Sequence, residues 1–379
     1  MNICPSPLLA PVRRPVLMAV MSIAMLAMTT ALLSNAAQAQ TSPSGSGAKT
    51  APSTIGTKPP AATRRESGVP GHYDKREEVQ AFIKMMAERH RYDPETLQKT
   101  FAAVRKQPDV LRLIAPPSRT YKRSWENYRT RFLDRTRING GLEFMQQHRA
   151  TLERAAQIYG VPVEVIVAII GVETIYGRVT GSFRIIETLT TLTFDYPRRA
   201  EFFSGELEHF LVLTREAGID PFEPRGSYAG ASGLPQFMPG SIRRYAVDFD
   251  RDGRIDLQGS VADSIGSVAR YLAEHGWVPG GPVYYPTRIA SEDKLQPLID
   301  AGIEPRYTSG ELSGFGVQAI GSVPDGTRMA LIDLPNGDNP TTYLLGARNF
   351  YVVTRYNRSS FYATAVLELA EALKNGQAQ

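Results

Sequence analysis

One glutamate directly follows a long apolar stretch. Residues 165–172 read Val-Ile-Val-Ala-Ile-Ile-Gly-Val, and Glu173 comes next without an intervening charge. This pattern predicts a buried helix that ends near Gly177 as its C-cap. Burial and the negative end of the helix dipole both oppose ionisation there, so we expect the pKa of Glu173 to be raised. A carboxyl that stays protonated near neutral pH is suited to general acid catalysis. The alternative is a glutamate that reaches solvent or pairs with Arg178.

The segment 226–239 reads Gly-Ser-Tyr-Ala-Gly-Ala-Ser-Gly-Leu-Pro-Gln-Phe-Met-Pro and combines small residues, hydroxyls, an amide and aromatic rings. Glycine allows a ligand to approach the backbone closely. Ser227 and Gln236 offer neutral hydrogen bonds, and Phe237 offers a ring face. The composition indicates an uncharged polyhydroxy ligand such as a sugar, the alternative being an irregular loop without a ligand. Aromatic residues near Tyr356 and Tyr362 suit the same groove, although such spacing is also typical of a core.

Three aspartates, Asp248, Asp250 and Asp252, precede Gly253 at the spacing of a calcium-binding loop. Acids at positions 1, 3 and 5 with glycine at position 6 place oxygens around a hard cation. Position 12 is a glycine here, so we expect Asp263 to supply the last carboxylate. The sequence thus predicts a structural calcium site, with a surface acidic turn as the alternative.

These candidate residues need a mostly helical framework. Apolar periodicity predicts helices that begin near Asp74 and after Asp93-Pro94, and further helices over 142–159, 163–172, 199–217, 260–275 and 361–373. Strand patterns occupy 283–285, 315–320, 328–334 and 341–345, with a turn at Asn336-Gly337. The fold class is therefore α+β, mostly α-helical, with one small antiparallel β insertion.

The first 71 residues have the composition of an export signal and a linker. Arg13 and Arg14 precede the apolar stretch 16–33, and Ala37-Gln38-Ala39 fits a cleavage site, so 1–39 is predicted to be a signal peptide rather than a retained anchor. Residues 40–71 are rich in Pro, Ser and Thr and predict a disordered linker. The single cysteine, Cys4, precedes the apolar stretch, so we expect a soluble exported protein without a lipoprotein anchor.

The net charge of +5, from 43 basic and 38 acidic residues, belongs to these first segments. From Gly71 onward, 37 basic residues face 37 acidic ones. A neutral body lacks the basic surface that binds phosphate backbones, which excludes a nucleic acid as the partner. The sequence also lacks G-x-S-x-G, G-x-x-x-x-G-K-[ST] and H-E-x-x-H motifs, and its cysteine lies in the signal.

Several long segments, in order, resemble the lytic murein transglycosylase B family from about Asp74 to Leu373. They are GVETIYGR, TLTFDYPRRAEFF, GSYAGASGLPQFMPGS, VDFDRDGRIDL, DSIGSVARYLAEHGW and VTRYN. The resemblance implies a lysozyme-like core and cleavage of the β-1,4 bond between N-acetylmuramic acid and N-acetylglucosamine in peptidoglycan. The muramic 6-hydroxyl then attacks and forms a 1,6-anhydro end, so one Glu serves as acid and then as base, where an ordinary glycosidase needs two carboxyl groups.

The resemblance also assigns residues. It implies that Glu173 is catalytic, and that the substrate is bound by Ser227, Gln236, Phe237, Arg198, Arg199, Tyr271, Tyr356, Asn357, Tyr362 and, as a weaker match, Tyr128. It implies Ca²⁺ held by Asp248, Asp250, Asp252, Asp263 and the Arg254 carbonyl, and no organic cofactor. The sequence departs from the family at Ile175-Tyr176, where many members have Arg-Trp, and at Phe202, where Tyr is common.

The expected domains are an N-terminal helical region (72–140) against which a C-terminal helix (354–375) packs, a lysozyme-like catalytic core with the calcium loop (141–280) and a β subdomain (281–353). The expected partners are peptidoglycan glycan strands and cell-wall synthesis or division proteins, with a monomer acting in the periplasm. Two other functions stay open. One is a hydrolytic muramidase with a second carboxylate such as Glu187 or Asp195, and the other is a non-catalytic peptidoglycan-binding protein.

Overall fold

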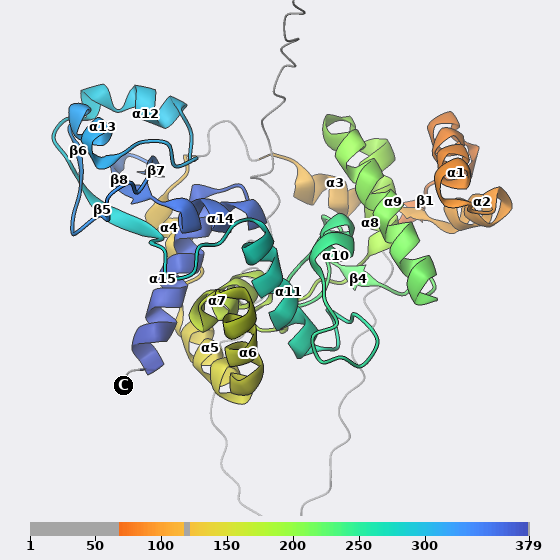
Figure 1. Cartoon of the computed structure of the whole chain (residues 1–379). Helices are drawn as coiled ribbons and strands as arrows, with labels where there is room; N and C mark the ends of the chain where they lie inside the picture. Colours follow the sequence, from red (N-terminus) through yellow and green to blue (C-terminus); the bar gives the residue numbers. More distant parts are fainter. Residues whose placement is uncertain (1–67, 117–121, 378–379) are drawn as a thin grey trace, which may run out of the picture.

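The computed structural model describes residues 68–116 and 122–377, and Figure 1 shows that helices dominate it. The predicted signal peptide (1–39) and nearly all of the predicted linker (40–71) lie outside the described residues. Three hydrophobic cores hold the described part together. The predicted α+β class with a small antiparallel insertion is confirmed.

The first core joins N-terminal helices to two helices from the middle of the chain. Its elements are η1 (Tyr73–Lys75), α1 (Glu77–His90), α2 (Pro94–Ala103), α3 (Pro108–Ile114), α8 (Ile185–Asp195) and α9 (Ala200–Ala217), and η2 (Pro197–Arg199) connects the last two. Asp93 caps α2 by accepting a hydrogen bond from the Thr96 N–H at 2.9 Å, as predicted. The structure differs here from the expected division of domains, because 72–114 cover the apolar faces of α8 and α9.

The second core surrounds α7 (Val163–Thr174), whose residues from Val165 onward are all buried. Its other helices are α4 (Trp125–Arg129), α5 (Arg135–Gln147), α6 (Arg149–Tyr159), α11 (Val261–Glu274), α14 (Arg348–Tyr356) and α15 (Ser360–Gln377), and α7 lies among them in Figure 1. The predicted buried helix after Pro162 is confirmed. The single helix predicted over 142–159 is wrong, because the chain leaves helical geometry at His148, between α5 and α6.

The C-terminal stretch 354–375 consists of the end of α14 and most of α15. α15 contacts α4 and α5, and it also packs along α7 inside the predicted catalytic core. Among the described residues, no single helix is long and apolar enough to cross a membrane. The helices α6 and α7 reach that length and composition only as a pair, with a bend of 113° between them.

The third core belongs to the β insertion, which appears as a separate lobe in Figure 1. Its strands are β5 (Tyr284–Ile289), β6 (Val317–Ala319), β7 (Ala330–Asn336) and β8 (Asn339–Gly346), in the antiparallel order β6-β5-β8-β7. They are accompanied by η3 (Glu292–Lys294), α12 (Gln296–Asp300) and α13 (Ser309–Gly314). Asn336 pairs with Asn339, so the turn is Gly337-Asp338, one residue later than predicted.

Short elements complete the chain. The two-residue strands β1 (Val69–Pro70) and β2 (Arg105–Lys106) pair with each other, as do β3 (Phe183–Arg184) and β4 (Arg225–Gly226). The segment 226–239, which the sequence predicts to bind a sugar, is called the sugar loop below; the helix α10 (Pro239–Tyr245) begins at its last residue and packs on α9. The β3–β4 pair ties the start of that loop to the segment between α7 and α8.

Candidate active site

Glu173 is the second-last residue of α7, and its carboxyl is buried in the second core. The residue is 5% exposed, and the Tyr362 hydroxyl of α15 donates a hydrogen bond of 2.7 Å to Oε1. The other oxygen, Oε2, is buried and has no hydrogen-bond partner among the described residues. Burial raises the pKa of Glu173 to about 8, although the hydrogen bond from Tyr362 acts in the opposite direction. The raised pKa is as predicted, and Arg178 contributes no ion pair to it.

The end of α7 differs from the prediction. Ile175, not Gly177, is the C-cap, and its N–H donates to the Gly171 carbonyl at 3.2 Å. Ile175, Tyr176 and Gly177 all have left-handed backbone angles, with φ of 52°, 58° and 87°. A non-glycine residue in this region costs on the order of 1–3 kcal/mol, and a β-branched residue such as isoleucine is rare there. Such strain next to a buried carboxyl is typical of functional sites.

The segment 226–239 is a fixed loop attached to α7 and α14. The Thr174 hydroxyl donates to the Leu234 carbonyl at 3.0 Å, and the Tyr356 hydroxyl donates to the Pro235 carbonyl at 2.6 Å. Gln236 has a φ of 50°, and its side-chain amide donates to the carbonyls of Thr180 (3.0 Å) and Gly233 (2.9 Å). The loop that the sequence pointed to therefore adjoins the helix that carries Glu173.

Ser227 lies at the start of this loop, and its side chain is buried. Its Oγ accepts a backbone hydrogen bond from Ala231 at 3.1 Å and a longer one from Ala229 at 3.4 Å. Ser227 thus shapes the tight turn around Gly230, whose φ of 88° suits glycine.

Aromatic rings connect the loop to Glu173. The Phe237 ring centroid lies 5.4 Å from that of Tyr271 and 5.7 Å from that of Tyr356, and Tyr356 stacks on Tyr362 at 6.4 Å. The Tyr271 hydroxyl donates to the Arg355 carbonyl at 2.6 Å, so Tyr271 and Tyr356 both use their hydroxyls to hold backbone. The structure brings these predicted residues together around the carboxyl.

Tyr128 stands at the edge of the same cluster. Its ring lies against Trp125, Phe132 and Phe361, and it is 9% exposed. Burial raises its pKa, and the nearby Glu173 adds to the effect. Tyr128, the weaker match to the family's substrate-binding residues, therefore lies next to the site.

Asn357 follows α14, and its side-chain oxygen Oδ1 is buried without a hydrogen-bond partner among the described residues. Most buried polar atoms in proteins have a partner, so an unpaired one requires an explanation. Oδ1 of Asn357 and Oε2 of Glu173 are therefore two acceptors to which a hydroxyl or amide group of a ligand can donate hydrogen bonds.

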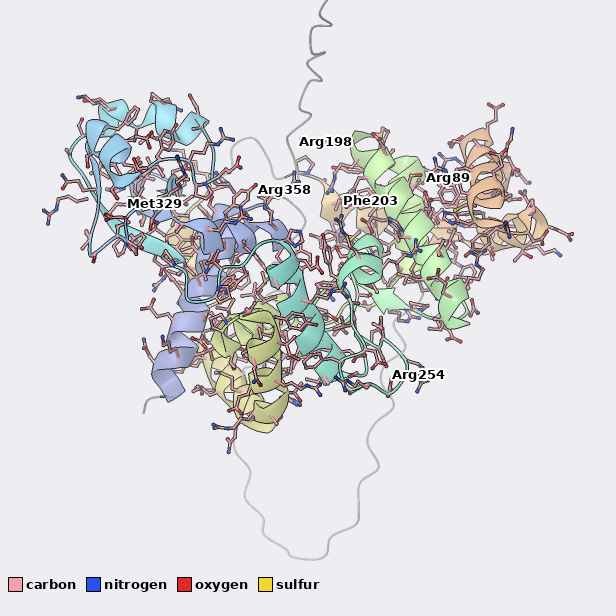
Figure 2. The ribbon with its side chains drawn as sticks, viewed as in Figure 1. Arg89, Arg198, Phe203, Arg254, Met329 and Arg358 are labelled. Atoms are coloured by element: carbon pink, nitrogen blue, oxygen red, sulfur yellow. The ribbon has the colours of Figure 1, made fainter. Side chains whose placement is uncertain are left out.

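The arginines of the predicted site lie just before α9. Arg198 is exposed, and the Arg199 guanidinium packs over Phe202 at 4.2 Å and Phe203 at 5.1 Å. Burial lowers the pKa of Arg199, and repulsion from Arg358, which follows α14, contributes to this shift. Figure 2 labels Arg198, Phe203 and Arg358. The structure therefore gathers positive charge from two separate segments.

The two carboxylates that a hydrolytic mechanism would use have other partners. Glu187 accepts a hydrogen bond of 2.5 Å from the Gln107 side chain. Asp195 accepts one of 2.6 Å from the Tyr73 hydroxyl and forms ion pairs with Arg76 (3.0 Å) and Lys106 (3.2 Å). Both carboxylates bind the N-terminal elements to α8.

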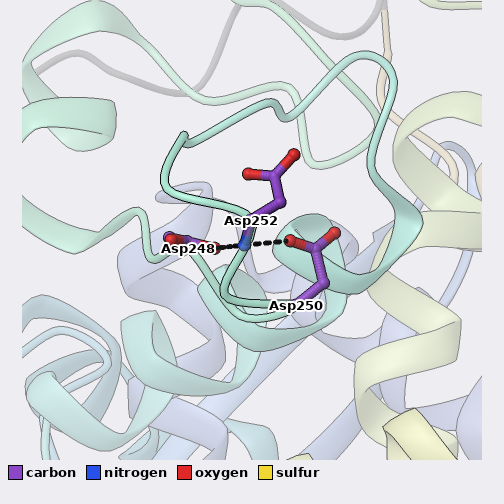
Figure 3. A group of neighbouring side chains, drawn as sticks. All are labelled: Asp248, Asp250 and Asp252. Carbon is purple, nitrogen blue, oxygen red and sulfur yellow. Dashed lines mark hydrogen bonds between the residues drawn. The ribbon is translucent and has the colours of Figure 1, made fainter.

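The acidic loop after α10 brings three carboxylates together. One oxygen each of Asp248, Asp250 and Asp252 lies within 4.8 Å of the others, and Figure 3 shows the hydrogen bonds from the Asp252 N–H to Asp248 (3.1 Å) and Asp250 (3.3 Å). This donor set fits a hard cation such as Ca²⁺. Arg254 is exposed, and its N–H donates to Oδ1 of Asp252 at 2.9 Å.

Asp263 does not join this group of carboxylates. It is 1% exposed on α11, and its two oxygens accept hydrogen bonds from the Phe249 N–H at 2.7 Å and the Asp256 N–H at 2.8 Å. Asp263 therefore stabilises the loop by accepting hydrogen bonds from its backbone. Its backbone contacts were not visible in the spacing of the acids.

Comparison with known proteins identifies the family. The family model described as "Transglycosylase SLT domain" matches residues 74–371. The chain belongs to the SLT transglycosylase family. It is 40% identical over 318 residues to the membrane-bound lytic murein transglycosylase B of Escherichia coli (strain K12), a match that covers 82% of this chain and 86% of that protein.

Solved structures of SLT transglycosylases have the same fold. The soluble lytic transglycosylase SltB1 from Pseudomonas aeruginosa is 42% identical, with a TM-score of 0.73 over 80% of this chain and 100% of that one. Escherichia coli Slt35 in complex with calcium is 39% identical, with a TM-score of 0.74 over 82% of this chain and 97% of that one. The predicted membership of the lytic transglycosylase family, and with it an enzyme of lysozyme-like fold, is confirmed.

Two residues of this SLT transglycosylase were not singled out as site residues from the sequence. Thr174 joins α7 to the sugar loop, and Tyr176 folds back onto α5, where its hydroxyl donates to the Arg137 carbonyl at 2.8 Å. The signal available for Tyr176 was the pair Gly140-Gly141, because adjacent glycines inside a helix are unfavourable unless another group needs the space.

The raised pKa of Glu173 predicts how stability depends on pH. Between the ordinary carboxyl pKa of about 4.5 and the folded value of about 8, the folded protein holds a proton that the unfolded chain has released. The wild type should therefore lose stability as the pH rises through this window, at no more than about 1.4 kcal/mol per pH unit. Glu173→Gln cannot ionise and should escape this loss.

Chemical denaturation at pH 5, 6.5 and 8 checks this, with the exposed Glu201→Gln as the control. Glu173→Gln should gain stability relative to the wild type with increasing pH, by a few kcal/mol in total. A constant difference across the three pH values would contradict a protonated, buried Glu173.

Proposed function

We propose that the protein cleaves the β-1,4 bond between N-acetylmuramic acid and N-acetylglucosamine in peptidoglycan glycan strands and forms 1,6-anhydromuramyl ends. The observation that carries this proposal is the buried carboxyl of Glu173, with its pKa near 8 and one unpaired oxygen. The carboxylates of Glu187 and Asp195 are held by the N-terminal elements, which favours a mechanism with one carboxyl over hydrolysis with two.

In the first step, Glu173 donates its proton to the glycosidic oxygen while the bond from that oxygen to the muramic C1 breaks. In the second step, the carboxylate accepts the proton of the muramic 6-hydroxyl as its oxygen forms a bond to C1. The proton count balances without water. Tyr362 occupies Oε1, so Oε2 is the oxygen that faces the substrate in this mechanism.

The residues around Glu173 suit a glycan with an anionic substituent. We assign the packed rings of Phe237 and Tyr356 to the sugar site, together with the unpaired acceptor Oδ1 of Asn357. Ser227 and Gln236 act on the substrate through the loop, because the Ser227 hydroxyl and the Gln236 amide already hold loop backbone. Tyr271 packs on both rings, and Tyr128 lies near the Glu173 carboxyl. Arg198 and Arg199 are placed to attract the lactyl or peptide-stem carboxylates of muramic acid. The relatives' names, which include murein, support the same substrate.

Calcium is proposed as a structural ion. Asp248, Asp250 and Asp252 would hold it, with the Arg254 carbonyl and, after a shift from its backbone contacts, Asp263. The complex of Slt35 with calcium supports this assignment. The ion would neutralise three carboxylates and order the loop between α10 and α11, and Glu173 supplies the proton chemistry. No organic cofactor is proposed.

The periplasm is the proposed place of action, because peptidoglycan is found there and residues 1–39 have the pattern of a cleaved signal. The absence of a lipoprotein anchor stays a prediction from the position of Cys4. Cell-wall synthesis or division proteins as partners, and the monomeric state, also stay predictions.

The catalytic role of Glu173 predicts the behaviour of its amide variant. Glu173→Gln should keep the fold and the hydrogen bond to Tyr362 while release of anhydro-muropeptides from purified sacculi falls by at least about a thousandfold, because the proton donor is lost. Mass spectrometry of the released fragments, with Glu201→Gln as the matched control, provides the measurement.

The product masses separate the three candidate functions. Anhydro ends support transglycosylation, and reducing ends would show a hydrolase. Sedimentation of the wild type with sacculi but without fragment release would indicate a non-catalytic binding protein. Near-normal turnover by Glu173→Gln would reject Glu173 as the acid.

Tyr362 predicts a shift in the pH profile. Its hydroxyl stabilises the carboxylate form of Glu173 and so lowers the pKa of Glu173 relative to burial alone. Tyr362→Phe should therefore raise that pKa and move the alkaline limb of kcat/KM, which we expect near pH 8 in the wild type, to higher pH. Tyr356→Phe is the control, since its hydroxyl bonds to Pro235, and it should leave the limb in place whatever its effect on the rate. An unmoved limb in Tyr362→Phe would contradict the assignment.

Calcium predicts a stability effect with a close control. Millimolar Ca²⁺ should raise the melting temperature of chelator-treated wild type by several degrees, since an ion at about 100 times its Kd adds about 2.7 kcal/mol. Asp252→Asn should lose most of this rise. Asp220→Asn should keep it, because Asp220 makes the same i to i+2 backbone hydrogen bond at 2.9 Å outside the acidic loop. A wild-type melting temperature that does not respond to Ca²⁺ would remove the proposed site.

A further inference from the structure

We propose that Tyr176 is a positioning residue for Glu173. Its ring occupies a socket, which is the space left by Gly140 and Gly141 of α5 and Gly171 of α7. The packing of the ring in this socket stabilises the left-handed turn that ends α7. The turn in turn fixes the direction of the Glu173 carboxyl. The inference rests on the proposed role of Glu173 as the acid.

The socket exists because Gly140, Gly141 and Gly171 have no side chains. A Cβ at Gly171 would lie 2.4 Å from the Tyr176 hydroxyl oxygen, and its three nearest neighbours would all be Tyr176 atoms. On α5, a Cβ at Gly141 would lie 2.5 Å from the same oxygen, and one at Gly140 would lie 3.1 Å from the ring. Real Cβ atoms essentially never come within 3.0 Å of another heavy atom, so Gly171 makes room for the tyrosine and Gly141 makes room for the tyrosine and for Leu373, while Gly140 allows a close fit to the ring.

Tyr176 is held in this socket at both ends. Its hydroxyl donates to the Arg137 carbonyl at 2.8 Å, and its ring lies 5.5 Å from the Phe144 ring, both on α5. The ring therefore connects α5 with the chain that has just left α7. One side chain thus fixes the backbone at Ile175 and Tyr176 in an otherwise unfavourable conformation.

The turn is linked directly to the acid and to the sugar loop. The Thr174 carbonyl accepts from Val179 at 2.9 Å, and the Thr174 hydroxyl accepts from Gly177 at 3.1 Å while donating to the Leu234 carbonyl. Glu173 is the residue before Thr174. A released turn would therefore loosen both the last turn of α7 and the contact of α7 with the loop.

Loosening should also change the surroundings of Glu173. The titratable side chains that interact with its charge among the described residues are tyrosines, namely Tyr128 of α4, Tyr271 of α11, Tyr356 of α14 and Tyr362 of α15. All four are neutral near pH 8, so desolvation controls the acid. Water that enters a frayed helix end would stabilise the carboxylate.

The test uses Tyr176→Leu, Tyr176→Phe, Gly171→Ala and the double variant Gly171→Ala with Tyr176→Leu. Gly205→Ala on α9 is the control, because a Cβ there has no atom within 4 Å. Anhydro ends released from a soluble glycan oligosaccharide give kcat and KM as functions of pH, and thermal unfolding gives the melting temperature of each variant.

We expect Tyr176→Leu and Gly171→Ala to lower kcat by about tenfold to a hundredfold with a nearly constant KM, since small misplacements of a catalytic group are costly. The alkaline limb should move to lower pH, with a smaller effect in Tyr176→Phe. Gly171→Ala should lower the melting temperature in the wild-type background but not in Tyr176→Leu, because the clash partner is gone. Gly205→Ala should keep the wild-type kcat and pH limb.

Three results would overturn the inference. These are an unchanged kcat and pH limb in Tyr176→Leu, a loss of kcat with an unmoved limb, and additive losses of melting temperature at positions 171 and 176. A wild type that releases no anhydro ends would instead reject the proposed function, and the double variant would still report whether the socket exists.

Discussion

The burial of one carboxyl without a counter-ion is the constraint on which the rest of the structure depends. Glu173 is the second-last residue of an apolar helix that is covered by α5, α6, α11 and α15, and no cation among the described residues contributes to its pKa. A carboxylate in such a place is costly, so the group keeps its proton instead. The tyrosines around Glu173 leave the protonated form favoured, because they are neutral and provide no positive charge that would stabilise the carboxylate. Glu173 therefore remains an acid in the folded protein, and the free energy of unfolding decreases as the pH rises above the ordinary carboxyl pKa.

This constraint also explains the order of elements along the chain. Tyr362, the hydrogen-bond donor to Glu173, lies 189 residues further on, in the last helix. The chain must therefore return to α7 after the β insertion. The insertion has its own core, formed by residues such as Leu298, Met329 and Leu345, so it can close on itself while its ends, Tyr284 and Gly346, pair with each other. The catalytic core is thus assembled from segments on both sides of a lobe that has a core of its own and that also packs its strand β7 against α4 and α15.

Local patterns predicted what local forces decide. The apolar run before Glu173, the Asp93 cap and the clustered acids of 248–252 are all visible in short windows of sequence, and the structure contains them. The helix α8 was not predicted, because its run of threonines and isoleucines has weak helix propensity. Its burial against α9 and the N-terminal helices outweighs that preference. The cap at Ile175 likewise depends on a tertiary contact, because the next residue, Tyr176, is held on α5.

Long-range contacts decided the details of the site. Tyr362 was expected in a sugar groove, yet its hydroxyl is committed to Glu173, and Asp263 was expected among the calcium ligands, yet both its oxygens hold backbone. In each case the residue type was informative, because a buried hydroxyl or carboxyl needs a partner. The partner itself could not be read from spacing, since it lies on another element.

A carboxyl that must first donate and then accept a proton benefits from opposing influences on its pKa. Burial makes Glu173 hold its proton near neutral pH, and it also makes the carboxylate that follows a strong base toward the 6-hydroxyl of the proposed mechanism. Burial alone would make the first transfer too unfavourable, because the carboxylate would form without stabilisation. The hydrogen bond from Tyr362 strengthens when the negative charge appears, so it helps the donation while it weakens the later base only in part. Tyr362, on a helix that is distant in sequence, thereby adjusts the pKa of Glu173 for both proton transfers. The proposed reaction can then use one carboxyl where other glycosidases use two.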